Sequence, residues 1–584
     1  MLPTKPTRRV QLLHITCLLF LASGLYIACS SGGNGSKHDE EEVLLAGGAP
    51  AITISPVVPA DIFTNGTPAS QATLSQAAAF AWQEFIALNW AAEPGFRDSA
   101  NAALAFGADS GHVPLVWHTF RHKVEIYPGN NQPPHGFNPT SPDFGYNTPS
   151  PGYFYNPDST GTADGQVKPY GTASTNTPWI NLDEINEIGV ATMFTGAGDS
   201  SRYPGQQILF LAKANKAEYA YAAQNGWYSG TQNTANGLAA AKKKTQAYIQ
   251  ANSNTPQPGG PDTLVSFPYG TIEIKTAWRR LTDTEKQSGH FYSTTVRYYR
   301  QDSVTNKPGY IDEVFGMVAL HIIHKTPTAP YFIFATFEQT DNILTTDGQP
   351  VEDQDGNIIA NQNLPALNPD FAVTNATPTT PQMFSPMTAN TIPGKSLYYQ
   401  NVTGEDLPVG TVTINKRLHP IPAEVIAVNK SAHNAIAQYN KTNNIGSPWL
   451  YYKLVNVQYK PIQKTPGVNY AGADSATYYL ANSVVESDYI LQEFSGKFSS
   501  TGFTITDFSG NQPTDTAHNA YYNGKYLMGG CMGCHGNATN GGSDYSFILG
   551  NTVKVPEFVA PAGQTAINLN SSKLKQIRAL LKLK

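Results

Sequence analysis

The sequence predicts a β-rich α+β protein, in which an antiparallel sheet forms the body and carries peripheral helices and long loops. Three observations support this prediction. Gly (50), Pro (42) and Tyr (31) are abundant, while charged residues make up only 14% of the 584 residues, which is typical of strands joined by long polar loops. Short apolar runs of strand length recur in the middle of the chain. After a Pro/Gly segment, Val265–Trp278 reads as a turn that enters an alternating strand.

The first residues have the features of a bacterial secretory signal. Lys5, Arg8 and Arg9 form a basic start, and a largely apolar stretch runs from Val10 to Ile27. We therefore expect residues 1–28 to be a signal peptide and the protein to be exported. An uncleaved anchor helix is the alternative, because the apolar run barely reaches the length needed to span a bilayer.

The signal sequence ends in a pattern that resembles a lipoprotein processing site. Ala28 and Cys29 precede a Ser/Gly stretch, so Cys29 is expected to carry a lipid anchor and the protein to lie in the periplasm or on the outer membrane. Tyr26 departs from the usual leucine, and ordinary cleavage without a lipid is the alternative. Residues 29–60 are rich in small and acidic residues and are predicted to be a tether.

Residues 61–255 are predicted to form an N-terminal region rich in helices and loops. Its clearest helix, from Thr73 to Trp90, has apolar residues at alternating four- and three-residue steps and Ser70 or Thr73 as its cap. A Pro/Gly/Tyr-rich loop, whose tyrosines are expected to pack onto the body, is predicted at 128–178. One strand is expected at 207–212, and two further helices are expected at 216–224 and 235–251.

Residues 256–584 are predicted to be a β-rich region, which follows a Pro/Gly segment at Ser253–Asp262 and could be continuous with the N-terminal region. Tyr331–Phe337 reads as a strand, and Val314–Ile323 as a buried strand or short helix. The segment from Thr477 to Phe494 is expected to open as a helix. Strands at 265–278 and 449–457 and a helix at 423–440 complete the expected elements.

The charge balance limits the kinds of partner. The net charge is −5, which is nearly neutral for a chain of this length. A nucleic-acid-binding protein needs a basic surface, so no nucleic-acid partner is expected.

Near the C-terminus the chain reads Cys531-Met532-Gly533-Cys534-His535. Two cysteines separated by two residues and followed by histidine form the attachment signature of c-type haem. Each thiol adds to one vinyl group of the porphyrin, and the histidine is then held where its imidazole can bind the iron. We therefore predict one covalent haem c, bound by Cys531, Cys534 and His535.

Three other chemistries fit a Cys-x-x-Cys pair: a dithiol redox pair, half of a zinc site, or a structural disulfide. A zinc site needs a second pair of ligands, and the other two cysteines lie within the first 29 residues. A redox pair of the thioredoxin type is expected in a βαβ setting, whereas this pair lies in a Gly/Asn-rich segment.

The second axial ligand is not evident from the motif. None of the 49 residues after His535 is a methionine or histidine, so the ligand lies upstream or the iron is five-coordinate. His321 and His324 are the predicted ligands; on a helix they would share a face, and on a strand they would point to opposite faces. The other candidates are Met317, His518 and Met528.

The haem motif and its flank resemble the cytochrome P-460 and cytochrome c-prime-beta family. In that family the motif is followed within about ten residues by Asp-Tyr-x-Phe, which is present here as Asp544–Phe547. The family's Pro-x-Gly-Thr strand is similar to Pro268–Thr271, with a lysine at Lys275. The resemblance spans about residues 265–548, with large insertions. The chain also resembles large uncharacterised bacterial single-haem cytochromes.

The family resemblance implies a haem lying on a small antiparallel sheet. Members transfer electrons or bind and oxidise small nitrogen species, and some crosslink a lysine to the haem, which makes Lys275 a predicted haem-binding residue. We expect electron transfer to a redox partner protein or small molecule. One alternative is a haem enzyme or gas binder acting on hydroxylamine, nitric oxide or peroxide, with Glu273, Glu338 or a histidine as the acid–base group. Another is a haem-bearing surface protein whose Tyr-rich N-terminal half binds a partner or polysaccharide.

Overall fold

The structure is a computed structural model, which describes part of the chain. The described residues are 48–108, 113–128, 133–152, 177–184, 192–195, 206–228, 237–251, 264–301, 308–342, 350–359, 397–400, 410–412, 420–460, 477, 479–486, 530–532, 535, 538 and 541–549. The predicted signal peptide and most of the predicted tether, including Cys29, lie outside these residues.

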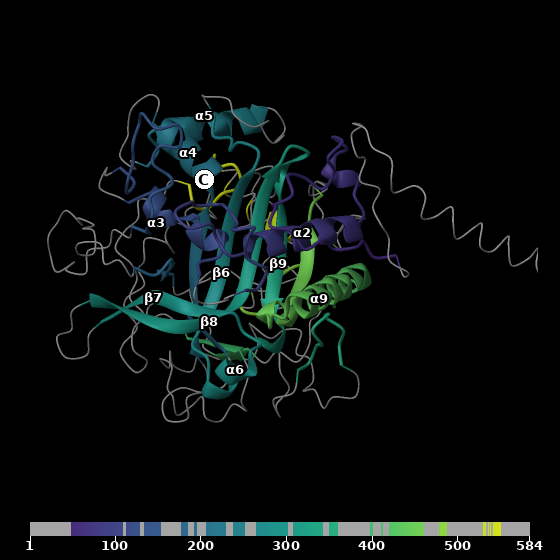
Figure 1. Ribbon diagram of the computed structural model, residues 1–584. Coiled ribbons are helices and arrows are strands. Elements are labelled where there is room, and N and C mark those ends of the chain that lie inside the picture. The colour runs from purple at the N-terminus through teal and green to yellow at the C-terminus, as the bar shows by residue number, and fades with distance from the viewer. Residues whose placement is uncertain are drawn as a thin grey trace, which may run out of the picture. The chain divides into compact units, whose positions relative to one another are not determined.

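An eight-stranded sheet is the centre of the fold, which confirms the prediction of a β-rich α+β protein (Figure 1). Its strands are β1 (Arg121–His122), β2 (Ile180–Leu182), β5 (Leu209–Ala214), β6 (Thr271–Arg279), β7 (Ser293–Gln301), β8 (Pro308–Thr326), β9 (Ala329–Gln339) and β12 (Tyr452–Gln458). All strand pairs in this sheet are antiparallel except β2 with β7.

Strand β8 is 19 residues long, and it joins the part of the sheet that contains β7 to the part that contains β6 and β9. Its first half pairs with β7, and its second half pairs with β6 on one side and β9 on the other. The segment that the sequence left open between strand and short helix is therefore strand. The order β1-β5-β6-β8-β9-β12 joins strands of the predicted N-terminal region to those of the predicted haem-bearing region.

A second, four-stranded sheet has the order β11-β10-β3-β4. These strands are β3 (Thr192–Thr195), β4 (Gln206–Gln207), β10 (Leu397–Gln400) and β11 (Gly410–Val412). The described helices are α2 (Leu74–Leu88), α3 (Lys123–Ile126), α4 (Lys216–Gln224), α5 (Leu238–Ala251), α6 (Asp283–Ser288) and α9 (Ala423–Asn443), and the 3-10 turns are Ala69–Gln71, Trp117–Thr119, Thr340–Asn342 and Pro448–Tyr451.

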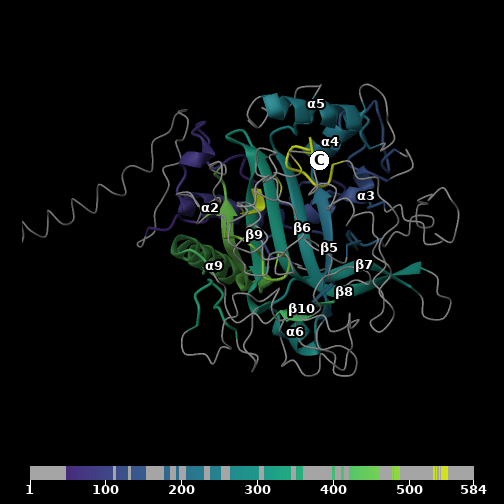
Figure 2. The same ribbon diagram turned by 180° about the vertical axis from the view of Figure 1, so that it is seen from behind.

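Helices α2 and α9 cover one face of the eight-stranded sheet (Figure 1). The hydroxyl of Thr73 accepts a hydrogen bond from the Gln76 amide, and the Gln76 side chain accepts one from the Thr73 amide, so a capping box begins α2. Trp82 and Phe85 of α2 pack against Phe337 of β9, with ring centroids 5.2 and 4.4 Å apart. Figure 2 shows the opposite face, where the described part of the C-terminal segment (yellow) lies over the strands.

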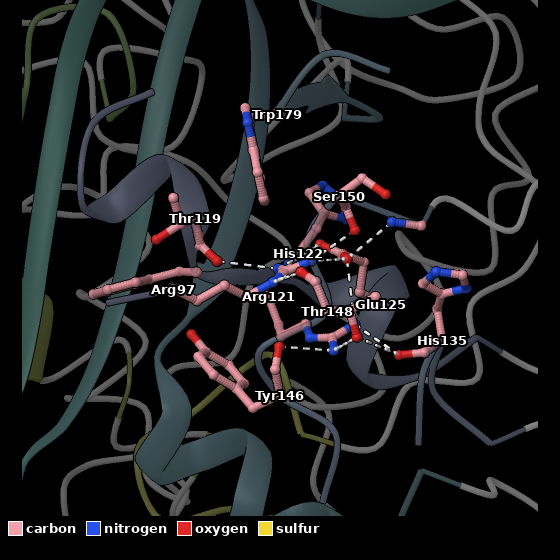
Figure 3. Close-up of polar contacts among 12 residues, drawn as sticks. Arg97, Thr119, Arg121, His122, Glu125, His135, Tyr146, Thr148, Ser150 and Trp179 are labelled. Carbon is pink, nitrogen blue, oxygen red and sulfur yellow. Dashed lines mark hydrogen bonds and ion pairs between the residues drawn. The ribbon is translucent and has the colours of Figure 1, made fainter. Parts of the chain in front are cut away.

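A buried charged cluster fixes the loop that follows α3 (Figure 3). Glu125 accepts hydrogen bonds from Arg97 and from the Gly152 amide. Arg121 donates to the carbonyl of Tyr146 at 2.9 Å. The described part of the predicted Tyr-rich loop therefore packs onto the body, as its buried Tyr146 shows; Tyr153, Tyr155 and Tyr170 lie outside the described residues.

Candidate haem site

Cross-strand register places four polar side chains in one row across the sheet. Lys275 of β6 pairs with His321 of β8, His321 pairs with Thr336 of β9, and Thr336 pairs with Asn456 of β12. Residues directly opposite each other in antiparallel strands point to the same face. This face is the one away from α2, since Phe337, which follows Thr336, contacts α2.

The described part of the C-terminal segment is fixed to this face by specific contacts. The Met532 amide donates to the Gln458 side chain at 2.9 Å. Farther along the segment, Asp544 forms a buried ion pair with Lys325 at 2.7 Å and accepts a hydrogen bond from the Phe267 amide at 2.6 Å. These contacts hold both ends of the described segment, so the histidine between them has a defined position.

His535 lies over the sheet between two aromatic rings, Phe334 of β9 and Phe547, with ring centroids 5.0 and 4.9 Å away. Its Nδ1 lies 2.6 Å from the carbonyl oxygen of Tyr545, which can only accept, so Nδ1 carries the proton in this contact. Burial of the ring lowers the pKa of His535 to about 4; the Tyr545 carbonyl opposes this shift and the charge of Lys275 adds to it. The imidazole is therefore neutral near pH 7, with the lone pair on Nε2.

His321 has a similar environment on the strand below. Its Nδ1 lies 3.0 Å from the hydroxyl of Thr336. Burial lowers the pKa of His321 to about 3, with Lys275 and His535 contributing in the same direction. Both imidazoles, with Lys275, therefore lie within electrostatic reach of one another on one face of the sheet.

Glu486 is a site residue that the sequence did not reveal. Its Oε1 lies 3.4 Å from Nε2 of His321, and its Oε2 accepts a hydrogen bond from the Asn482 amide at 2.6 Å. Burial raises the pKa of Glu486 to about 8, with Glu338 contributing in the same direction and Lys275 opposing it. The expected helix from Thr477 is wrong in its described part, because residues 479–482 are irregular and Ser483–Glu486 form a turn that carries Glu486 to the sheet.

Glu273 and Glu338, the two carboxylates predicted as acid–base groups, lie at different places on the face of the sheet that carries His321. Glu338 accepts a hydrogen bond from the Ser483 amide at 3.1 Å, beside Glu486. Glu273 lies next to Glu218 of α4, and the hydroxyl of Ser546 also bonds to it. Burial, opposed by the Ser546 and Glu218 contacts and aided by Asp544, raises the pKa of Glu273 to about 7. Glu273 thus belongs to a buried carboxyl pair under the C-terminal segment.

His324, the other predicted iron ligand, lies on the wrong face of the sheet. It is three residues from His321 on the same strand, so its side chain points toward α2, where its Nδ1 lies 2.5 Å from Glu84 Oε1. This correction follows from the strand geometry of β8. Met317 pairs with Trp278, four residues from His321 along the strand; Cys534, His518 and Met528 lie outside the described residues.

The described residues of the motif, Cys531 and His535, fit a covalently bound haem. Cys531 is half-buried and packs beside the core, and Gly530–Met532 and His535 are helical. The Nδ1 contact of His535 with a carbonyl is the outer-shell arrangement that fixes the tautomer of metal-binding histidines. Among the described residues, no group of three or more His, Cys, Asp or Glu could hold a metal ion; a haem iron needs only one or two protein ligands, because the porphyrin supplies the rest.

No family model matches the chain, no curated protein matches it, and no solved structure matches it. Within the described residues, no helix combines the length and the apolar character needed to cross a membrane.

Proposed function

We propose that the chain is an exported c-type cytochrome with a single haem, and that it transfers electrons to a redox partner protein or small molecule. Cys531 and Cys534 would hold the haem through thioethers, and His535 would bind its iron through Nε2. Export and a lipid anchor at Cys29 belong to the same proposal, because they rest on the leader sequence. When bound, the haem supplies one-electron exchange between ferric and ferrous iron.

The contact between His535 Nδ1 and the Tyr545 carbonyl at 2.6 Å is the observation that carries this proposal. A histidine held in this way presents the Nε2 lone pair in a fixed direction, which is what an axial ligand requires. The rings of Phe334 and Phe547 pack at its sides. Apolar packing of this kind restricts solvent around a haem and affects its potential. Lys275 acts electrostatically on His535, which supports its assignment as a haem-lining residue.

A haem enzyme or gas binder acting on hydroxylamine, nitric oxide or peroxide is the second candidate function. The observation that favours it is the buried Glu486, which lies 3.4 Å from His321 on the face that His535 covers. An acid–base group close to an open iron site can donate or accept protons during the oxidation of such substrates. The two functions differ in whether a second protein ligand occupies the iron.

Replacement of both cysteines tests the proposed function. The full chain would be expressed in a bacterium that has the c-type haem attachment system, and haem would be stained on a denaturing gel. We expect the wild-type band to stain and the Cys531→Ala/Cys534→Ala variant to lose the stain. Cys29→Ala is the matched control, because it removes a thiol outside the motif. It also removes the proposed lipid anchor, but haem binding does not require that anchor, so the stain should be unchanged. An unstained wild-type band, or staining that survives the double replacement, would contradict the proposal.

A further inference from the structure

We propose that His321 is the second axial ligand of the haem iron, so that the iron is held between the imidazoles of His535 and His321. This inference rests on the proposed function, because it requires the haem. It extends that function by assigning a six-coordinate, bis-histidine iron, which suits electron transfer better than reaction with a small molecule.

Position on the sheet is the first support. His321 is in the row of β8 that faces the C-terminal segment, beside Lys275 of β6 and Thr336 of β9. His535 is fixed over the same face by its contact with Phe334, which is two residues from Thr336 on β9. At His321 the strand is paired on both sides, with β6 and with β9, so the residue is presented from a well-constrained position.

The orientation of the ring is the second support. Nδ1 of His321 lies 3.0 Å from the Thr336 hydroxyl, as Nδ1 of His535 lies 2.6 Å from the Tyr545 carbonyl. The Tyr545 carbonyl leaves Nε2 of His535 as the atom available to a metal. The Thr336 hydroxyl does the same for His321 when it accepts the Nδ1 proton. Thr336 is then a positioning residue, which fixes the ring that binds the iron without touching the iron itself.

The buried Nε2 atom of His321 is the third support. Among the described residues, Nε2 of the buried His321 has no hydrogen-bond partner. A buried polar atom without a partner costs free energy, and such an atom in a native protein calls for an explanation. A bond to iron would satisfy this atom.

Glu486 defines the competing arrangement. Its Oε1 lies 3.4 Å from Nε2 of His321, but this contact lacks the geometry of a hydrogen bond. Its carboxyl instead accepts a good hydrogen bond from the Asn482 amide at 2.6 Å. If His321 and Glu486 formed an acid–base pair beside a five-coordinate iron, their contact would be expected to be a direct hydrogen bond.

Optical and electron paramagnetic resonance spectra of the purified, haem-loaded full chain test the inference. We expect a low-spin ferric spectrum with two histidine ligands and ferrous protein that does not bind carbon monoxide on mixing. His321→Gly should give a high-spin, CO-binding haem, and added imidazole should restore the low-spin spectrum by filling the space left by the side chain. His321→Met keeps a side chain that can bind iron and should show the long-wavelength absorption of a methionine-bound ferric haem.

Three further variants sharpen this test. His324→Gln changes a histidine three residues away on the opposite face and should leave the spectrum unchanged. Thr336→Val removes the hydroxyl that orients the ring and should allow slow CO binding. Glu486→Gln should retain the low-spin spectrum.

A wild-type haem that is high-spin and binds CO at once would overturn the inference, as would a His321→Gly variant that remains low-spin without imidazole. Failure of the proposed function itself would look different, because the purified chain would then contain no covalent haem.

Discussion

Nζ of Lys325 lies 2.7 Å from Oδ2 of Asp544, in an ion pair whose two side chains are almost fully buried. The pair joins the end of β8 to the segment that carries the haem motif, across 219 residues of sequence. Asp544 also accepts the Phe267 amide at 2.6 Å, so one carboxylate connects three distant parts of the chain. It therefore anchors the segment that follows His535 to the strand that carries His321.

Removing one partner of this pair should be strongly destabilising. Asp544→Asn leaves the Lys325 charge buried without its counter-charge, and we expect the free energy of unfolding to fall by about 3–5 kcal/mol. Urea unfolding followed by circular dichroism measures this. Lys286→Met is the matched control, because Lys286 and Asp283 form an exposed pair at 3.3 Å and exposed pairs contribute little. Equal effects of the two replacements would show that the buried pair does not hold the segment.

Acid should remove the stabilisation that comes from Glu125. Burial would raise its pKa, but the guanidinium groups of Arg97 and Arg121 outweigh burial and lower the pKa to about 2. A lowered carboxyl pKa stabilises the fold above the unfolded-state value near 4.5, and this contribution is lost as the pH falls toward 2. Glu125→Gln should therefore cost about 3 kcal/mol at pH 6, and its difference from wild type should shrink steadily between pH 4.5 and 2. A pH-independent difference would refute this explanation.

The carboxyl pair of Glu218 and Glu273 should have the opposite pH dependence. Burial and the neighbouring carboxyl raise the pKa of Glu218, and the pKa of Glu273 is raised to about 7. A raised carboxyl pKa gives stability that is complete below about pH 4.5 and is lost as the pH rises through 7. Glu218→Gln keeps the side-chain size and removes a carboxyl whose ionisation the fold disfavours, so it should stabilise the protein by about 1–3 kcal/mol at pH 8 and by little at pH 4. Thermal melts at the two pH values measure this; destabilisation at pH 8 would contradict it.

Local pattern was enough to predict some elements of the body. The apolar period of α2 and the Thr73 cap are local signals, and so are the apolar runs that became β8 and β9. For a strand, His321 and His324 were also predicted to point to opposite faces of the sheet. Which of the two conformations forms depends on neighbours, because a short apolar run suits a strand and a buried helix equally well.

Most of the candidate site depends on pairings that local sequence does not contain. Lys275 and His321 are neighbours only because β6 and β8 pair in one particular register. Glu486 lies at the site because Ser483–Glu486 form a turn, in a segment that was predicted to open as a helix. The Cys-x-x-Cys-His motif could be read directly from Cys531, Cys534 and His535, and the haem that its spacing predicts stays a prediction.

Mass spectrometry of one peptide tests the central claim most directly. Trypsin should release residues 526–554 as a single peptide, which contains Cys531, Cys534 and His535 and no other cysteine. From protein made in a host with the c-type haem attachment system, we expect this peptide to carry the mass of one haem with both thiols consumed. The same peptide with two free thiols, or with a disulfide and no haem, would contradict the assignment.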